Sequence, residues 1–285
     1  MKTVLQTIQS GTPYLEKAGV ESARLNMEHL LAHVMGCKRM DLYLRFNEPL
    51  EENILEPLRD LTRRRAKREP LQHLLGTLEF MGREFICDAR ALIPRPETEE
   101  LVEKILTHYK KHPLPAPTEI LDMGTGSGVI GLSLAHAFPE AHTTLADVSS
   151  DALALARENA DKTALPGARA SFVLTHLFQN LPGGPFDLIV ANLPYIAADE
   201  VPTLSPEVQR DPVLALDGGP AGTEIIAEFL AQLRPHAAPR AFLALEIGAG
   251  QATALLPLMS NSGLQESRSV PDYSGRDRFL FATAP

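Results

Sequence analysis

The chain has 285 residues, of which 44% are hydrophobic and 22% are charged, and its formal net charge is −9. These values are typical of a soluble protein with one large or two smaller globular domains, and no apolar run is long enough to span a membrane. The acidic charge argues against a broad nucleic-acid-binding surface. Because the first residues lack the apolar core of a signal peptide and the two cysteines show no metal-ligand spacing, we expect a cytoplasmic protein with free thiols and no metal site.

The N-terminal part of the chain, to about residue 70, is predicted to be helical. Apolar residues recur on one face of residues 5–20, in which Gly11-Thr12-Pro13 is a candidate break. Ser22 is predicted to cap a second, amphipathic helix over residues 23–35, which ends at Gly36.

A third helix is predicted from about residue 51 to residue 68. Proline fits best in the first turn of a helix, so Pro57 moves the expected start toward Glu56. The helix ends in a basic run, residues 63–68. We interpret this run as a solvated helix end that suits the helix dipole, and the alternative is a docking patch for an acidic partner.

A connecting region follows. Residues 78–87 alternate in polarity around Met81-Gly82 and are predicted to form a β-hairpin. Pro94-Arg95-Pro96 is a stiff loop, and a helix with carboxylates in its first turn is predicted from Glu97 to Lys111.

From Thr118 onward, strand patterns and helix patterns alternate, which predicts a parallel sheet with helical crossovers. The predicted strands cover residues 120–122, 143–147, 170–174, 186–191 and 240–247, with a closing pair at 264–270 and 278–282. The predicted helices cover residues 129–137, 151–162 and about 222–233, and Ser149 or Ser150 caps the second of them.

The turn Asp122-Met123-Gly124-Thr125-Gly126-Ser127-Gly128 joins the first of these strands to its helix. Glycines let such a turn bend tightly and let a ligand approach the main chain, and Asp147, at the end of the next strand, suits the two hydroxyls of a ribose. Together they predict a nucleoside-binding unit. Residues 126–131 also match the dinucleotide pattern, but no site for a hydride acceptor is evident, so S-adenosylmethionine fits better.

The tetrad Asn192-Leu193-Pro194-Tyr195 follows the buried strand at 186–191, at the edge of the sheet where ligands bind. The Asn192 amide offers an acceptor oxygen, Pro194 restricts the Leu193 backbone, and Tyr195 adds a flat ring. These groups could hold a planar group that carries an NH2. The alternative is an ordinary Asn-x-Pro turn.

These motifs resemble the HemK/PrmC family of release-factor glutamine methyltransferases over nearly the whole chain. The residues that carry the resemblance are 22–31, 93–99, 122–128, 192–195, 211–219, 245–248 and 272–279. The resemblance implies an α/β fold: a seven-stranded, Rossmann-like S-adenosylmethionine-dependent methyltransferase domain preceded by a small helical domain and a β-hairpin. The implied domains are a helical substrate-recognition domain at 1–70, a hairpin connector at 71–90 and the methyltransferase domain at 91–285.

The resemblance also implies methyl transfer from S-adenosylmethionine to the glutamine side-chain nitrogen in the Gly-Gly-Gln motif of peptide-chain release factors, with S-adenosylhomocysteine as the second product. It implies that the tetrad is catalytic and holds this glutamine together with Arg95 and Glu97. The residues implied to bind the cofactor are Gly124, Thr125, Gly126, Ser127, Gly128, Asp147, His176, Leu177 and Asn192. This sequence has Leu193 where the family usually has proline, and His176 where it usually has an acidic residue.

Two other functions compete with this interpretation. Nucleic-acid adenine methyltransferases use a similar tetrad on the amine of a flipped base, so the tetrad alone does not separate the two classes. The acidic net charge and the N-terminal helices favour a protein substrate. A non-catalytic adaptor that binds release factors is the third possibility, and the complete nucleoside unit and tetrad argue against it.

Overall fold

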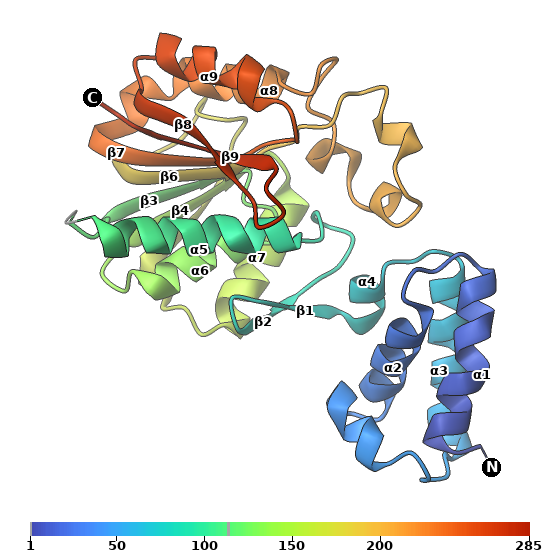
Figure 1. Cartoon of the computed structure of the whole chain (residues 1–285). Helices are drawn as coiled ribbons and strands as arrows, with labels where there is room; N and C mark the ends of the chain where they lie inside the picture. The colour runs from blue at the N-terminus through green and yellow to red at the C-terminus, as the bar shows by residue number, and fades with distance from the viewer. Residues whose placement is uncertain (1, 113–114) are drawn as a thin grey trace. The chain divides into compact units, whose positions relative to one another are not determined.

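The computed structural model describes residues 2–112 and 115–285 and divides the chain into two compact units (Figure 1). The first unit contains residues 1–78 together with Ser205–Arg210, and the second contains Glu79–Leu204 and Asp211–Pro285. No helix in the described ranges is both long and apolar enough to cross a membrane. Cys37 and Cys87 are free, as predicted.

The first unit is helical. Its elements are α1 (Val4–Lys17), α2 (Ala23–Val34), η1 (Arg39–Leu44), α3 (Glu52–Ala66) and α4 (Leu71–Leu75). Helix α1 starts with a capping box between Thr3 and Gln6 and runs unbroken through the candidate break. Gly11 is needed there because a Cβ at this position would overlap the Met27 sulfur of α2.

The predicted start of α2 after Ser22 is confirmed, but capping by the Ser22 side chain and the predicted start of α3 near Glu56 are wrong. Ser22 occupies the N-cap position of α2, but its backbone is left-handed (φ 50°) and its side chain caps nothing; instead, Asn26 Nδ2 donates to the Glu21 and Ser22 carbonyls. Helix α3 begins at Glu52, so Pro57 lies in its interior rather than in its first turn. The proline is tolerated because this face of the helix is exposed, which lets water satisfy the carbonyl that lacks a donor.

The basic run at the end of α3 is not the uniformly solvated surface that was predicted. Arg65 is buried, and its Nη2 lies 2.9 Å from Glu207 Oε1, while Arg68 contacts both oxygens of Glu207 at 2.6 Å. Glu207 belongs to the segment Ser205–Arg210, which is part of the first unit. Arg63 and Arg64 remain largely exposed.

The second unit contains the predicted seven-stranded sheet, in the order β5-β4-β3-β6-β7-β9-β8, in which β9 runs antiparallel to the other six described strands. The strands are β3 (Glu119–Met123), β4 (His142–Asp147), β5 (Ala170–Leu174), β6 (Phe186–Asn192), β7 (Ala237–Glu246), β8 (Gln265–Pro271) and β9 (Asp277–Thr283). The fold class and the strand positions are therefore confirmed.

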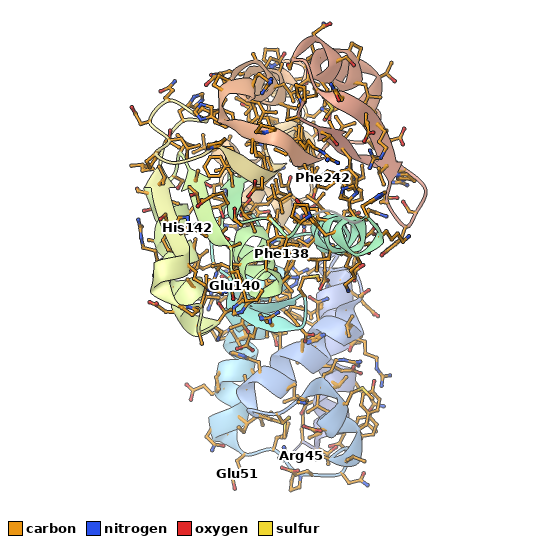
Figure 2. All side chains as sticks on the ribbon, turned by 90° about the vertical axis from the view of Figure 1, so that its left-hand side faces the viewer. Arg45, Glu51, Phe138, Glu140, His142 and Phe242 are labelled. Carbon is orange, nitrogen blue, oxygen red and sulfur yellow. The ribbon has the colours of Figure 1, made fainter. Side chains whose placement is uncertain are left out.

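Helices cover both faces of this sheet (Figure 1). One face carries α5 (Pro96–Lys111), α6 (Val129–Ala137) and α7 (Ser150–Lys162), and the other carries α8 (Glu224–Gln232) and α9 (Ala252–Asn261). The central strands are buried on both faces, as parallel strands require. Phe242 of β7, labelled in Figure 2, stacks on His108 of α5 at a ring-centroid distance of 3.9 Å. Helix α9 was not predicted.

The predicted hairpin is present as β1 (Thr77–Phe80) and β2 (Arg83–Ile86). Met81 and Gly82 form its turn, and both have positive φ angles, of 50° and 70°. A two-residue turn with this pair of angles matches the twist of the flanking strands, which is why a glycine stands at one of the two positions.

Candidate active site

The site lies at the switch point of the sheet, where β3 connects onward to β4 on one side and β6 connects to β7 on the other. Met123 of β3 is the parallel partner of Ala191 of β6, so the next residues, Gly124 and Asn192, lie at the same edge of the sheet. Ligands of open α/β sheets bind at this place. The residues that follow the two strands pack closely together, because a Cβ on Gly124 would lie 2.9 Å from Leu193 Cδ2.

Backbone hydrogen bonds to the end of β4 hold the glycine-rich turn in place. Gly124, Gly126 and Gly128 have φ angles of 70°, 54° and 84°, which side chains with a Cβ rarely adopt. The N–H groups of Gly124 and Thr125 donate to the Ala146 carbonyl at 2.8 and 3.0 Å. This arrangement fixes the turn against the end of β4 and leaves the main chain open to a ligand.

The buried side chain of Asp122 fixes the turn through hydrogen bonds. Its Oδ2 accepts from Thr125 Oγ1 at 2.6 Å and from the Gly131 N–H at 2.8 Å. The carboxyl is fully buried, and burial raises its pKa to about 6, although these hydrogen bonds oppose the rise. Asp122 therefore supports the turn and does not face the pocket.

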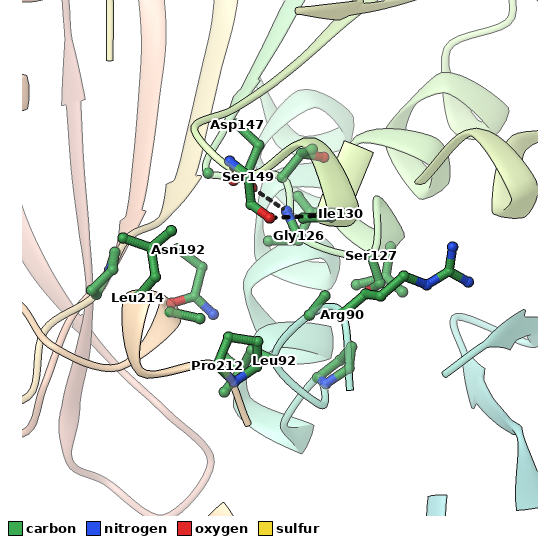
Figure 3. A pocket seen from close by; sticks show the side chains of 18 of the residues that line it. Arg90, Leu92, Gly126, Ser127, Ile130, Asp147, Ser149, Asn192, Pro212 and Leu214 are labelled. Atoms are coloured by element: carbon green, nitrogen blue, oxygen red, sulfur yellow. Dashed lines mark hydrogen bonds between the residues drawn. The ribbon is translucent and has the colours of Figure 1, made fainter. Parts of the chain in front are cut away.

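Asp147 ends β4 beside the turn, and its carboxylate is oriented by backbone donors (Figure 3). Oδ2 accepts from the Gly126 N–H and Oδ1 from the Ser149 N–H, both at 2.8 Å. Burial raises the pKa of this carboxyl, and the backbone hydrogen bonds lower it. Each carboxylate oxygen retains a further lone pair, so Asp147 can still accept from two hydroxyls of a ribose.

One pocket brings the two halves of the site together. Figure 3 shows Asp147 of β4 and Asn192 of β6 at the same pocket. The predicted residues that line it are Gly124, Thr125, Gly126, Ser127, Asp147, Asn192 and Pro194. The lining residues that were not predicted to belong to the site include Arg90, Leu92, Thr98, Ser149, Pro212 and Leu214.

The tetrad is fixed from several sides. Asn192 Nδ2 donates to Thr98 Oγ1 at 3.2 Å, and the Leu193 side chain is buried. The Tyr195 hydroxyl lies 3.4 Å from Glu246 Oε1, and the Tyr195 carbonyl accepts from Gln251 Nε2 at 2.8 Å. Burial and the neighbouring Glu246 raise the pKa of the Tyr195 hydroxyl, which keeps it neutral.

Arg95 and Glu97 do not line the pocket, and their predicted contact with substrate stays a prediction. Arg95 Nη2 donates to Asp211 Oδ2 at 3.2 Å. Asp211 is buried, and burial raises its pKa to about 6 against the effect of Arg95. The pair connects the loop before α5 to the loop that carries the pocket residues Pro212 and Leu214.

His176 and Leu177 follow β5 and also lie outside the lining of the pocket. Leu177 is buried with a φ angle of 47°, and His176 Nδ1 lies 3.7 Å from Glu228 Oε1. A cofactor contact for these two residues stays a prediction, as it does for Gly128, whose missing Cβ allows close contact with Ala156.

Strand order and pocket position together define the class of protein, which is an S-adenosylmethionine-dependent methyltransferase with an α/β fold. Residues 6–76 match a family model described as "PrmC N-terminal domain", and residues 100–207 match "Methyltransferase small domain". The chain is 38% identical to the release factor glutamine methyltransferase of Geobacter sulfurreducens over 98% of its length and 95% of the relative. For the enzyme of that name from Deinococcus radiodurans the identity is 39%, over 96% of each chain. The chain belongs to this family.

Solved structures show the same fold at lower identity. The catalytic domain of hMettl16 in complex with a MAT2A 3′UTR hairpin has a TM-score of 0.55 and 17% identity, with 79% of this chain and 82% of that chain covered. The T. thermophilus 16S rRNA N2 G1207 methyltransferase, in complex with AdoMet and guanosine, has a TM-score of 0.51 and 17% identity, with 73% and 50% covered. At this identity the likeness describes the fold alone.

Proposed function

We propose that the protein transfers a methyl group from S-adenosylmethionine to the side-chain amide nitrogen of the glutamine in the Gly-Gly-Gln motif of peptide-chain release factors. The observation that carries this proposal is the single pocket in which the glycine-rich turn and Asp147 meet Asn192 and Pro194. The names of the full-length relatives give the substrate class.

The residues present fit the cofactor. Glycines at 124, 126 and 128 give the turn its positive φ angles at the pocket, and Asp147 holds an oriented carboxylate for the ribose. When bound, S-adenosylmethionine supplies a methyl group already activated by its sulfonium. The protein therefore has to bind, orient and exclude water, and no strong base is required.

Asn192 and Leu193 are proposed to orient the glutamine. An amide nitrogen is a weak nucleophile because its lone pair is delocalised into the carbonyl. The Asn192 side-chain oxygen and the Leu193 carbonyl would accept its two hydrogens and direct the lone pair toward the methyl group. These hydrogen bonds strengthen as positive charge builds on the nitrogen, so they act on the transition state. The proton then leaves to water.

The helical unit is proposed to recognise the release factor, since it has no glycine-rich turn and matches the N-terminal model of the family. A release factor substrate implies that the protein acts in the cytoplasm. We expect neither membrane nor direct nucleic-acid contacts, because the net charge is −9. This acidity also makes the adenine-methylating alternative the weaker one.

Incubation of the purified protein with labelled S-adenosylmethionine and purified release factors tests the proposal. We expect label on the glutamine of the Gly-Gly-Gln peptide, located by mass spectrometry of tryptic fragments. A release factor with this glutamine replaced by alanine is the matched control and should remain unlabelled. Label on DNA or RNA but not on the factor would instead support a nucleic-acid methyltransferase.

A further inference from the structure

The side-chain amide of Asn192 has two ends with opposite hydrogen-bonding character, and catalysis as proposed above needs its oxygen to face the glutamine. Nothing in Asn192 itself distinguishes the two orientations, because an amide turned by half a rotation occupies the same space. The surrounding residues therefore have to select one. Those residues lie on α5 and β7, outside the tetrad.

Thr98 is the first of them. It lies in the first turn of α5, is buried, and accepts from Asn192 Nδ2 at 3.2 Å. A hydroxyl has one proton, and it can accept from Asn192 in this geometry while that proton is donated elsewhere. If the hydroxyl donated to Asn192 instead, the amide would have to turn and its oxygen would leave the pocket.

Glu246 is the second residue that can select the orientation of Asn192. It is the last residue of β7 and the direct parallel partner of Asn192, so the two side chains lie on the same face of neighbouring strands. The carboxyl is buried, and within the described residues its Oε2 has no hydrogen-bond partner. Thr98 contacts Asn192, and Glu246 lies beside Asn192 in the sheet, so this unpaired acceptor lies near the Thr98 hydroxyl. A carboxyl in this place can accept a hydrogen bond from the Thr98 hydroxyl.

We propose that Thr98 and Glu246 are positioning residues that hold Asn192 with its amide oxygen toward the substrate. Glu246 accepts the hydrogen bond of the Thr98 hydroxyl, which leaves Thr98 as an acceptor, and only the NH2 end of Asn192 can then face it. Glu246 also binds the Tyr195 hydroxyl, so one carboxyl orients both ends of the tetrad. The inference rests on the proposed function, because it explains how the glutamine-holding group is aligned.

Thr98→Val is the direct test, since valine has the shape of threonine without the hydroxyl. We expect kcat for glutamine methylation to fall about 10-fold or more, because a small misplacement of a positioning group is costly in rate. Cofactor affinity by calorimetry should change far less than kcat, because the glycine-rich turn and Asp147 are untouched. Thr98→Ser, which restores the hydroxyl, should return kcat close to the wild-type value.

A matched control removes another buried hydroxyl from the same unit. Thr143 lies in β4 and is fully buried, and its hydroxyl makes no hydrogen bond within the described residues. Thr143→Val should leave kcat unchanged. If it lowers kcat as much as Thr98→Val, the loss reflects packing and the inference is wrong.

Asn192→Asp distinguishes a loss of amide orientation from a packing defect caused by Thr98→Val, because a carboxylate presents oxygen at both ends. In this background Thr98→Val should cost much less than in the wild type. An equal cost in both backgrounds, or a Thr98→Ser variant as slow as Thr98→Val, would overturn the inference.

A readout independent of transfer distinguishes failure of this inference from failure of the proposed function. The side-chain 15N–1H signals of Asn192, assigned by their absence in Asn192→Ala, should exchange with water more slowly in the wild type and Thr98→Ser than in Thr98→Val. Equal exchange in all three contradicts the positioning role even if the substrate is not a release factor. Slower exchange without methylation of the factor would overturn the proposed function alone.

Discussion

Asn192 combines two structural roles, since it ends a central strand and presents an amide to the pocket. Its neighbour Leu193 differs from the proline that the family usually has, and its side chain packs beside Gly124 instead of entering the pocket. Leu193 does not line the pocket, and the proposed contact to substrate uses its main-chain carbonyl, which either side chain retains. The mechanism therefore predicts a sharp difference between changes at these two adjacent positions.

Asn192→Ala should reduce the single-turnover rate of glutamine methylation by roughly 100- to 1,000-fold, as expected for the loss of one preorganised polar contact. Asn192→Asp should retain more activity than alanine and less than wild type, because it keeps an acceptor but adds a charge beside the cofactor. Leu193→Pro is the matched control and should change the rate little. A wild-type rate for Asn192→Ala at saturating cofactor and factor would refute the mechanism.

Glu246 makes stability depend on pH. Burial raises its pKa from 4.5 to about 7, and the charge of Glu97 adds to the rise, while Thr98, Arg278 and Tyr195 oppose it. Since the folded-state pKa is raised, the stabilisation of the protonated form is complete below the unfolded pKa and is lost as pH rises through the folded pKa.

Glu246→Gln removes this ionisation. Between about pH 5 and pH 8 the variant should gain roughly 1–3 kcal/mol of unfolding free energy relative to wild type. Urea unfolding of both proteins at the two pH values measures the difference. An equal difference at both values would show that Glu246 does not titrate in this range.

The residues that could be identified from sequence are those with a local signature. Gly124, Gly126 and Asp147 follow strands in a spacing that reports a nucleoside site, and the structure places them on one pocket. Thr98 carries no such signature, since its partner Asn192 is 94 residues away and the contact exists only after α5 packs on the sheet. Glu246 likewise occurs in a strand pattern that predicts burial but not its partners.

Helix α3 and the segment Ser205–Arg210 also show that local sequence patterns do not predict contacts between residues far apart in the chain. The sequence predicts a basic helix end because runs of arginine are usually solvated, but Glu207 pairs with Arg65 and Arg68 from 139 to 142 residues away. The Pro57 prediction also failed, because exposure lets water replace a missing hydrogen bond. Strands were predicted well, since their continuous apolar runs reflect burial itself.

Glu207→Ala should release the segment from α3. Burial raises the pKa of Glu207, and the hydrogen bonds from Arg68 and Arg65 lower it to a net value below the ordinary one. The ion pairs therefore stabilise the segment above the unfolded pKa of the carboxyl, and this contribution is lost as pH falls through the folded pKa.

Amide hydrogen exchange over residues 205–210 measures the effect, which we expect as faster exchange in Glu207→Ala at neutral pH. Glu52→Ala is the matched control, because Glu52 forms an exposed ion pair with Arg59 on the same helix and exposed pairs contribute little. Unchanged exchange in Glu207→Ala would show that other contacts hold the segment.

The helical unit also contains the feature that best suits its proposed role in recognising the release factor. A groove between α1, α2 and α3 has an apolar floor that includes Met27 and Leu58, and basic side chains at its sides. The residues that line it are Lys2, Thr7, Ser10, Gly11, Tyr14, Met27, Leu55, Leu58, Arg59, Thr62 and Arg63. Tyr14 is 50% exposed there, and an exposed aromatic beside basic residues is typical of a protein-binding surface.

Acidic substitutions in this groove should weaken binding of the release factor without affecting methyl transfer. The double variant Tyr14→Glu/Arg63→Glu should raise KM for an intact release factor about 10-fold or more, which corresponds to about 1.4 kcal/mol of binding. Its kcat at saturation should be unchanged, because the pocket of the second unit is untouched. A short Gly-Gly-Gln peptide lacks the remote contacts, so its methylation should not respond to the variant. Lys17→Glu, at the end of α1 and outside the groove, is the control and should behave as wild type with both substrates. If KM for the intact factor stays at the wild-type value in the double variant, this groove does not bind the factor.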